Sequence, residues 1–169
     1  MERGQAQTEV EGRAETELER YDRNLTELMG ELRVALPGVQ VLFAFLLVAP
    51  FNQRFGRTTK FERDLYFAAL LCTLLASILL IAPTVIHRLE FRRGRKAYIV
   101  TTANRLTIAG LIVFAFGMTC AIALVTSYLL GTATAIVTTA ITVLAFSTIW
   151  FVMPLLRRRA SDRARGLSP

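Results

Sequence analysis

The sequence predicts an all-α integral membrane protein: a four-helix antiparallel bundle with a cytoplasmic amphipathic helix before the first span. Between Leu106 and Leu156 no side chain carries a charge. As one helix this segment would be about 76 Å long at 1.5 Å per residue, whereas the hydrocarbon core of a bilayer is about 30 Å thick. We therefore expect the chain to fold back at Gly131, because glycine eases a reversal. Two further apolar segments lie upstream, and 53% of all residues are hydrophobic.

The first 36 residues precede most of the apolar sequence and differ from it in pattern. We expect residues 1–14 to form a disordered acidic tail, because they show no apolar periodicity. Residues 15–36 predict an amphipathic cytoplasmic helix. Its apolar positions recur in steps of three and four, at Leu18, Tyr21, Leu25, Leu28, Leu32 and Ala35. The acidic outer face matches anionic lipid poorly, so we expect the helix to pack against another copy, a membrane protein partner or the chain's own basic loop.

Residues 37–156 form the predicted transmembrane domain. At its start, Pro37-Gly38 predicts a kink or a restart of the helix, because proline disfavours helical dihedral angles at the preceding residue and lacks a backbone donor. A continuous bent helix is the alternative, because the apolar seam continues through Val39 and Leu42. The four predicted spans cover about residues 34–51, 65–86, 106–130 and 133–156.

Basic residues are divided unequally between the segments that flank these spans. With both termini on one side, 16 of the 20 Lys and Arg residues lie on that side and 4 on the other. Basic segments stay in the cytoplasm during insertion, so we expect both termini to be cytoplasmic and the location to be the bacterial cytoplasmic (inner) membrane. Residues 157–169 are the predicted basic cytoplasmic tail. No cleavable signal peptide is expected, because the first 33 residues are polar.

The densest basic residues all fall on the predicted cytoplasmic face. They are Arg92, Arg93, Arg95, Lys96, Arg157, Arg158 and Arg159. We expect these side chains to contact anionic lipid headgroups, with an acidic partner as the alternative. Nucleic acid is not an expected partner, because the basic residues flank apolar spans and form no surface interleaved with aromatic residues.

Small and hydroxyl-bearing residues predict how the spans pack, because close contact of small side chains drives association in lipid. Stripes in the second and third spans consist of Ala68, Cys72 and Ala76; Ala69, Thr73 and Ser77; and Ala115, Thr119, Ala123 and Ser127. Gln40, Thr138 and Thr142 form a candidate intramembrane polar site, such as the wall of a path for ions or water. The simpler interpretation is helix packing, because a threonine hydroxyl can return to a carbonyl of its own helix.

Ionisable groups are missing from all four apolar cores, which disfavours proton or sodium transport through the chain. His87 lies beside a predicted span and is interpreted as a polar anchor, with a pH sensor or a base as the alternative. At the opposite surface we expect Glu62 and Asp64 to pair with Arg63 or Arg57. The alternative is a cation site that Glu62 and Asp64 form together with Tyr66. We predict no catalytic residue, no cofactor, no metal site and no enzymatic activity.

A family resemblance extends over most of the chain. Residues 22–47, Phe55-Gly56-Arg57, Ile81-Ala82-Pro83 with His87-Arg88, and Ala103-Asn104-Arg105 resemble a family of small bacterial four-span membrane proteins of unknown function. Some similar sequences carry an automatic sodium:proton antiporter label. The resemblance implies four spans, and it transfers no functional residues to this chain.

Two functions fit this sequence. The first is a structural, interaction or regulatory component of the membrane, which is favoured by the amphipathic helix beside an inert apolar domain. The second is a small transporter or ion/proton antiporter component, in the form of an oligomer with a pore between copies. This second function is favoured by Gln40 and by the threonine stripe of the fourth span, which consists of Thr134, Thr138 and Thr142.

Overall fold

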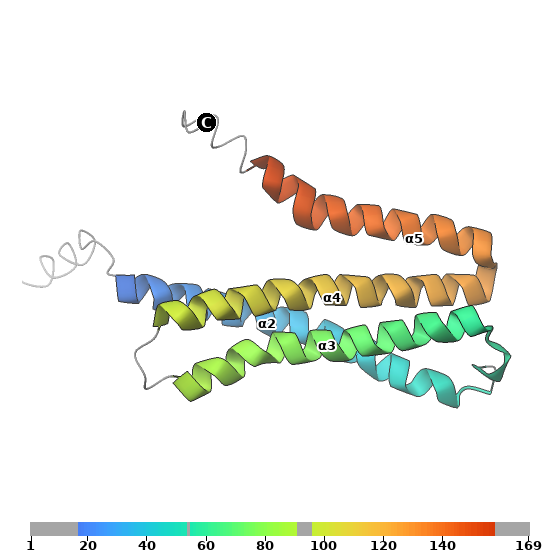
Figure 1. The fold of residues 1–169 in the computed structure, drawn as a ribbon, viewed down its shortest axis with the longest axis horizontal. Coiled ribbons are helices and arrows are strands. Elements are labelled where there is room, and N and C mark those ends of the chain that lie inside the picture. The colour runs from blue at the N-terminus through green and yellow to red at the C-terminus, as the bar shows by residue number, and fades with distance from the viewer. Residues whose placement is uncertain (1–16, 54, 91–95, 158–169) are drawn as a thin grey trace, which may run out of the picture.

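The computed structural model describes residues 17–53, 55–90 and 96–157, in which every regular element is helical. The four long helices are α2 (Glu17–Val48), α3 (Lys60–Glu90), α4 (Lys96–Leu130) and α5 (Thr132–Ser147) (Figure 1). Two short 3₁₀ helices, η1 (Ala49–Phe51) and η2 (Phe55–Arg57), lie between α2 and α3, and a π-helical stretch, η3 (Thr148–Val152), follows α5. By length and composition, four helices could cross a membrane.

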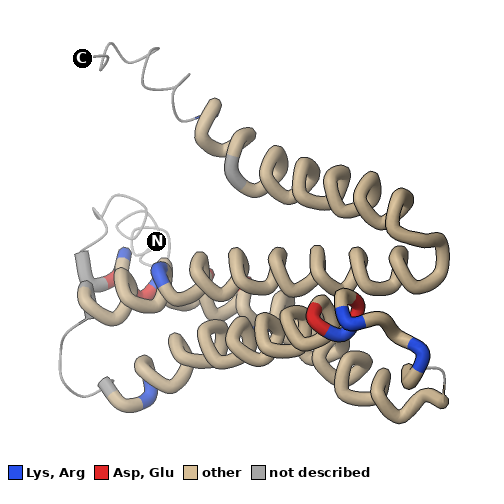
Figure 2. The backbone as a smooth tube through the Cα atoms, turned by 45° about the vertical axis from the view of Figure 1, so that its right-hand side comes forward, with Lys and Arg blue, Asp and Glu red and all other residues tan. Residues whose placement is uncertain are grey.

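Successive helices run in opposite directions, which gives the molecule two ends (Figure 1). At the Arg88 end α2 begins, α3 ends and α4 begins. At the Gly131 end α2 ends, α3 begins and α4 turns into α5. Gly131 makes this turn with a positive φ of 87°, a conformation that costs glycine little. Charged residues of the described ranges gather toward the two ends (Figure 2). Residues 65–86 of α3 and 106–130 of α4 carry no charge, whereas the charges of α2 extend from its start to Arg33.

Helix α2 is continuous from Glu17 to Val48 and contains Pro37. Of the two alternatives for Pro37-Gly38, the structure therefore agrees with a continuous helix and not with a helix restart. The reason lies in which face is buried. Leu32 and Val39, on either side of the proline, are both buried, whereas Pro37 and Gly38 are exposed. The backbone bond that proline removes therefore lies away from the packed seam, and the contacts of the seam hold the helix together.

The seam of α2 packs against the chain's own helices. Leu28 and Leu32 belong to one apolar cluster with Ala76 and Leu80 of α3 and Ala103 of α4. Within the described residues, this part of the seam is thus covered by α3 and α4 of the same chain. Burial of these side chains leaves the charged face of α2 on the outside.

Helices α3 and α4 share the most extensive interface of the molecule. The fully buried residues of α3 on this face are Ala69, Thr73, Ala76 and Leu80. This seam advances by four, three and four residues, so it crosses both stripes predicted for the second span. Steps of three and four keep these residues on one face, because an α-helix has about 3.6 residues per turn. On α4, Gly110 and Gly117 allow the close approach, because a Cβ atom on Gly110 would lie 2.8 Å from Cγ of Leu80.

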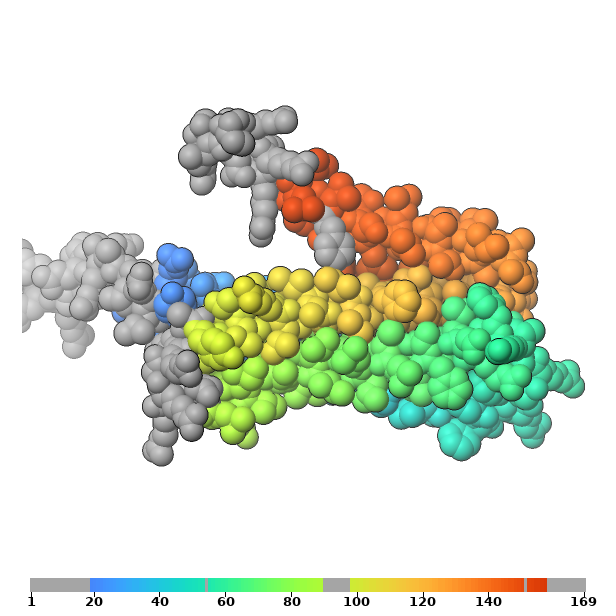
Figure 3. Space-filling model, viewed as in Figure 1, coloured from blue at the N-terminus to red at the C-terminus, as the bar shows by residue number. Residues whose placement is uncertain are grey.

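Helix α5 stands apart from a closed bundle. Among the helices of the described ranges it contacts only α4, and its far end diverges from the other three (Figures 1 and 3). The face toward α4 carries the buried Ala135 and the half-buried Thr138 and Thr142. The threonine stripe is therefore a packing surface of α5.

One buried hydroxyl in the described ranges lacks a hydrogen bond. Oγ1 of Thr107 on α4 is buried without a partner, whereas Oγ1 of Thr119, also buried on α4, donates to the Ala115 carbonyl at 2.8 Å. An unmade hydrogen bond inside a protein costs about 1–3 kcal/mol. We therefore expect Thr107→Val, which keeps the shape and removes the orphan group, to raise the free energy of unfolding by about 1 kcal/mol.

Thermal unfolding in a mild detergent measures this change, with Thr119→Val as the matched control. The control removes a hydroxyl that is already bonded, so it should gain nothing. A loss of stability in Thr107→Val that equals or exceeds the loss in Thr119→Val would contradict the prediction.

Candidate functional site

The Gly131 end holds the best-developed polar contacts between helices, and the first involves Tyr66 of α3. Its hydroxyl is buried and donates to the Leu46 carbonyl of α2 at 2.9 Å. In a regular helix the amide of residue 50 would donate to this carbonyl, but residue 50 is proline and has no N–H. Tyr66 therefore satisfies an acceptor that the sequence of α2 leaves open, and it ties the end of α2 to α3. The Phe55 ring stacks edge-on against it, at 5.1 Å between ring centroids.

Glu62 makes the second contact, from the first turn of α3 to the last turns of α4. Its side chain is only 7% exposed. Oε2 accepts the Thr59 amide at 2.8 Å and Oγ1 of Thr59 accepts the Glu62 amide at 3.2 Å, which is the reciprocal capping box of a helix start. Oε1 accepts the hydroxyl of Ser127 at 3.2 Å. Glu62, Tyr66 and Ser127 form what we call the Gly131-end cluster, which fastens three helices together.

The cluster differs from the expectation for Glu62. Among the described residues, its partners are the Thr59 amide and the Ser127 hydroxyl, and neither Arg57 nor Arg63 pairs with it. The carboxylate turned inward because it caps α3, where the positive end of the helix dipole stabilises an anion. The sequence contains the local signal for this role in Thr59-x-x-Glu62. Nothing local indicates Ser127, which lies 65 residues further along the chain.

The chemistry available to the cluster is limited. A carboxylate that accepts the hydroxyl of a serine holds that hydroxyl in place, whereas nucleophilic serine needs a stronger base such as imidazole. His87 lies 25 residues from Glu62 on the same helix, which is about 37 Å away. No group of three or more His, Cys, Asp or Glu suited to a metal ion occurs within the described ranges. The arrangement is suited to joining helices rather than to catalysis.

The predicted basic cluster is described only in part. Arg92, Arg93, Arg95, Arg158 and Arg159 lie outside the described residues. Lys96 begins α4 at the Arg88 end, and Arg157 lies exposed beyond η3.

The candidate intramembrane polar residues do not converge. Gln40 is exposed on α2. Thr138 and Thr142 donate their hydroxyls to carbonyls of their own helix, those of Thr134 at 3.0 Å and Thr138 at 2.8 Å respectively. Both hydroxyls are thus used inside α5, as threonine allows without any outside partner.

The two cysteines are free thiols on facing helices. Cys72 of α3 packs against α4 at Gly117, where an added Cβ would lie 3.2 Å from the Cβ of Cys72. Cys120 is buried one turn further along α4. In this contact both cysteines serve as small packing residues.

Comparison with known proteins gives one finding. Neither the search of curated proteins nor the search of solved structures produced a match. A family of unknown function, DUF6328, matches residues 14–154. This match covers α2 to η3 together, including Glu62, Tyr66 and Ser127. The chain belongs to the DUF6328 family of unknown function.

Proposed function

We propose that the protein is a multi-pass component of the bacterial cytoplasmic membrane with both termini in the cytoplasm. The four long apolar helices support this placement. The stretch of α3 from Leu65 to Ile86 is free of charge and about 33 Å long, which matches the hydrocarbon core. The excess of basic residues on the side of the two termini supports the orientation. In this placement the Arg88 end is cytoplasmic, and its Lys and Arg residues contact anionic lipid headgroups.

We propose a structural or interaction role for this component, carried by one observation: α2 buries its apolar seam inside the molecule and leaves its charged face outside. Leu32 is 2% exposed, whereas Asp22, Glu27 and Glu31 are exposed. The part of α2 that precedes its apolar stretch, Glu17–Arg33, is about 25 Å long. Packing against α3 and α4 holds this part in place, so it presents a preformed charged surface to a membrane protein partner at little entropic cost.

The exposed charged residues of α2 are Glu19, Arg20, Asp22, Arg23, Glu27, Glu31 and Arg33. Arg23 and Glu27 form an ion pair of 3.7 Å along the helix. Such exposed pairs contribute little to folding. Mixed charges of this kind favour one register of a partner helix over others.

The second function considered, an ion-translocating component, gains no support from the described residues. The hydroxyls of the threonine stripe bond within α5, and Gln40 lies on the exposed surface of α2. Among the acids of the described ranges, Glu62 is the buried one, and it caps the first turn of α3. It therefore lies outside the apolar middle of that helix. We also propose that the protein is not an enzyme, because its single histidine, His87, and the buried acid Glu62 lie at opposite ends of α3, about 37 Å apart.

Photo-crosslinking in native membranes tests the interaction role. A photoreactive residue is placed at Gly30, which lies on α2 between Glu27 and Glu31 and has no atom within 4 Å of an added Cβ. We expect a discrete protein adduct at this position. Reversing two charges, Glu27→Lys with Glu31→Lys, should reduce the adduct at least about fivefold, since like charges juxtaposed across an interface repel.

The control uses the same photoreactive residue at Phe61, which is exposed at the Gly131 end. An adduct at position 30 that survives the double charge reversal, or adducts with lipid alone, would remove the interaction role while leaving the membrane placement intact.

A further inference from the structure

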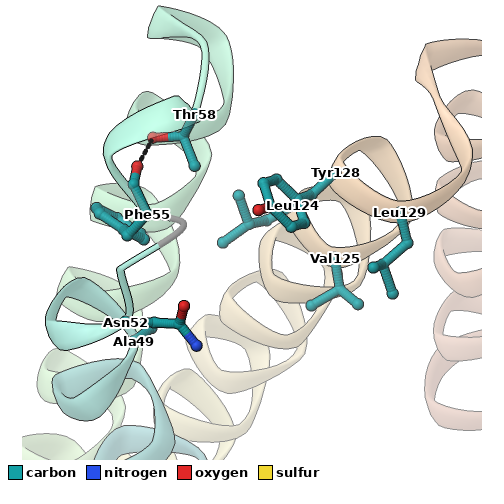
Figure 4. Close-up of a pocket in the computed structure, with 8 residues that line it drawn as sticks. All are labelled: Ala49, Asn52, Phe55, Thr58, Leu124, Val125, Tyr128 and Leu129. Atoms are coloured by element: carbon teal, nitrogen blue, oxygen red, sulfur yellow. Dashed lines mark hydrogen bonds between the residues drawn. The ribbon is translucent and has the colours of Figure 1, made fainter.

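A pocket of about 340 Å³ opens at the Gly131 end, beside the Gly131-end cluster. One wall is the segment that follows α2, and the other is formed by the last turns of α4 (Figure 4). The volume lies at the lower end of the range of ligand sites, about 300–1,000 Å³. The pocket is open to its surroundings, because the lining residues Val125 and Leu129 are 54% and 68% exposed. It can therefore be filled from the side of the molecule.

Both walls change from apolar to polar in the same direction. Along α4, Leu124 and Val125 come before Tyr128, and along the other wall Ala49 comes before Asn52. The apolar Leu129 follows Tyr128 on α4, and the apolar Phe55 follows Asn52 on the other wall. Figure 4 shows the Asn52 amide and the Tyr128 hydroxyl directed toward the space between the walls. The pocket thus has an apolar inner part and a rim that combines polar and apolar residues.

This gradient follows the axis of the helices, and under the membrane placement proposed above it follows the membrane normal. The rim then lies at the level of lipid headgroups and the inner part at the level of acyl chains. Tyrosine is enriched at this level because its ring is apolar and its hydroxyl is polar. Arg57 and Lys60 are exposed within two residues of the rim residue Thr58. Their charges complement a phosphate group.

We infer that the pocket binds one phospholipid from the outer leaflet, a site that rests on the membrane placement proposed above. One acyl chain lies along Leu124 and Val125 in the inner part. The glycerol and ester groups lie at the rim, beside the polar side chains of Asn52 and Tyr128. The phosphate lies toward Arg57 and Lys60. Such a lipid fills the space between the end of α2 and α4, where side chains leave a gap.

Native mass spectrometry of the full-length protein tests this site. The protein is reconstituted with phosphatidylglycerol or phosphatidylethanolamine, extracted in detergent and delipidated in steps. We expect the wild type to retain one phospholipid after the others are lost. Val125→Trp fills the inner part and should reduce the retained fraction at least about fivefold. Ile122→Trp is the matched control, since Ile122 is 40% exposed on α4 outside the pocket, and it should retain lipid as the wild type does.

A second measurement does not depend on how the tryptophan variant folds. A phospholipid with a photoreactive acyl chain is expected to label the wild type within residues 124–129 in preference to the exposed face of α5. Equal retention in both tryptophan variants, or labelling spread evenly over the apolar surface, would overturn the lipid site. Failure of the chain to insert into the vesicles would instead remove the membrane placement, and the crosslinking at Gly30 tests the partner separately.

Discussion

Replacement of Gly110 by leucine is expected to cause the largest loss of stability of any single change in the α3–α4 interface. A Cβ at this position would lie 2.8 Å from Cγ and 2.9 Å from Cδ2 of Leu80, and 3.2 Å from Cβ of Leu79. Leu80 is fully buried, so it has no free volume into which to move. Overpacking of this kind costs about 3 kcal/mol. The free energy of unfolding, measured in detergent, should fall by about that amount.

Two further substitutions make this prediction specific. Gly117→Ala adds a Cβ at 3.2 Å from that of Cys72, so it should cost less than Gly110→Leu. Gly30→Ala serves as the control, because nothing lies within 4 Å of its added Cβ. That change should stabilise α2 by about 0.5–1 kcal/mol through helix propensity alone. Equal stability of Gly110→Leu and the wild type would show that α3 and α4 are less closely packed than the structure has them.

Replacement of Glu62 by alanine is expected to have the second largest effect, because it removes two kinds of contact at once. The capping interaction with Thr59 is lost, and losses of this kind cost about 1 kcal/mol. The Ser127 hydroxyl also loses its charged acceptor, and hydrogen bonds to charged groups contribute about 1.5–3 kcal/mol. Since the carboxylate is buried, water cannot easily replace it. Because both contacts are made by one carboxylate, the two losses are not fully additive, and we expect the free energy of unfolding to fall by about 2 kcal/mol.

A double-mutant cycle separates the two contributions. Ser127→Ala alone should cost about 1 kcal/mol, and the double variant should cost less than the sum of the two single variants, because the residues share a hydrogen bond of 3.2 Å. The control is Asp64→Ala, which removes an exposed acid two residues away and should leave stability nearly unchanged. Strict additivity of the Glu62 and Ser127 variants would refute the coupling across α3 and α4.

Much of the Gly131-end cluster was present in the sequence as local signals. Thr59-x-x-Glu62 is a capping-box pattern, and Pro50 leaves the Leu46 carbonyl without its usual donor. The partners could not be predicted, because Tyr66 and Ser127 reach these groups only in one relative position of the helices. The expectation that Glu62 pairs with an arginine followed from nearness in the chain, whereas burial of its side chain selected a hydroxyl of α4.

Residues 15–36 show the same division between what a local pattern predicts and what tertiary contacts decide. The heptad pattern of residues 15–36 correctly predicted an apolar seam, and Leu28 and Leu32 are buried in it. The pattern carries no information about what covers the seam, since any apolar face of the right shape would serve. Because α2 runs through Pro37 without ending, its seam stays aligned with α3 and α4 and is covered by them.

Sequence by itself determined the four long apolar segments and the turn at Gly131. These depend on neighbours in the chain: the length of apolar runs, the donors missing at prolines and the freedom of glycine in φ. Only the tertiary structure decided which faces meet, that α5 contacts α4 alone, that Glu62 joins Ser127 and that a pocket remains beside Tyr128. Each of these features depends on the register and the angle between two helices. Close packing sets both, and it involves side chains that lie far apart in the sequence.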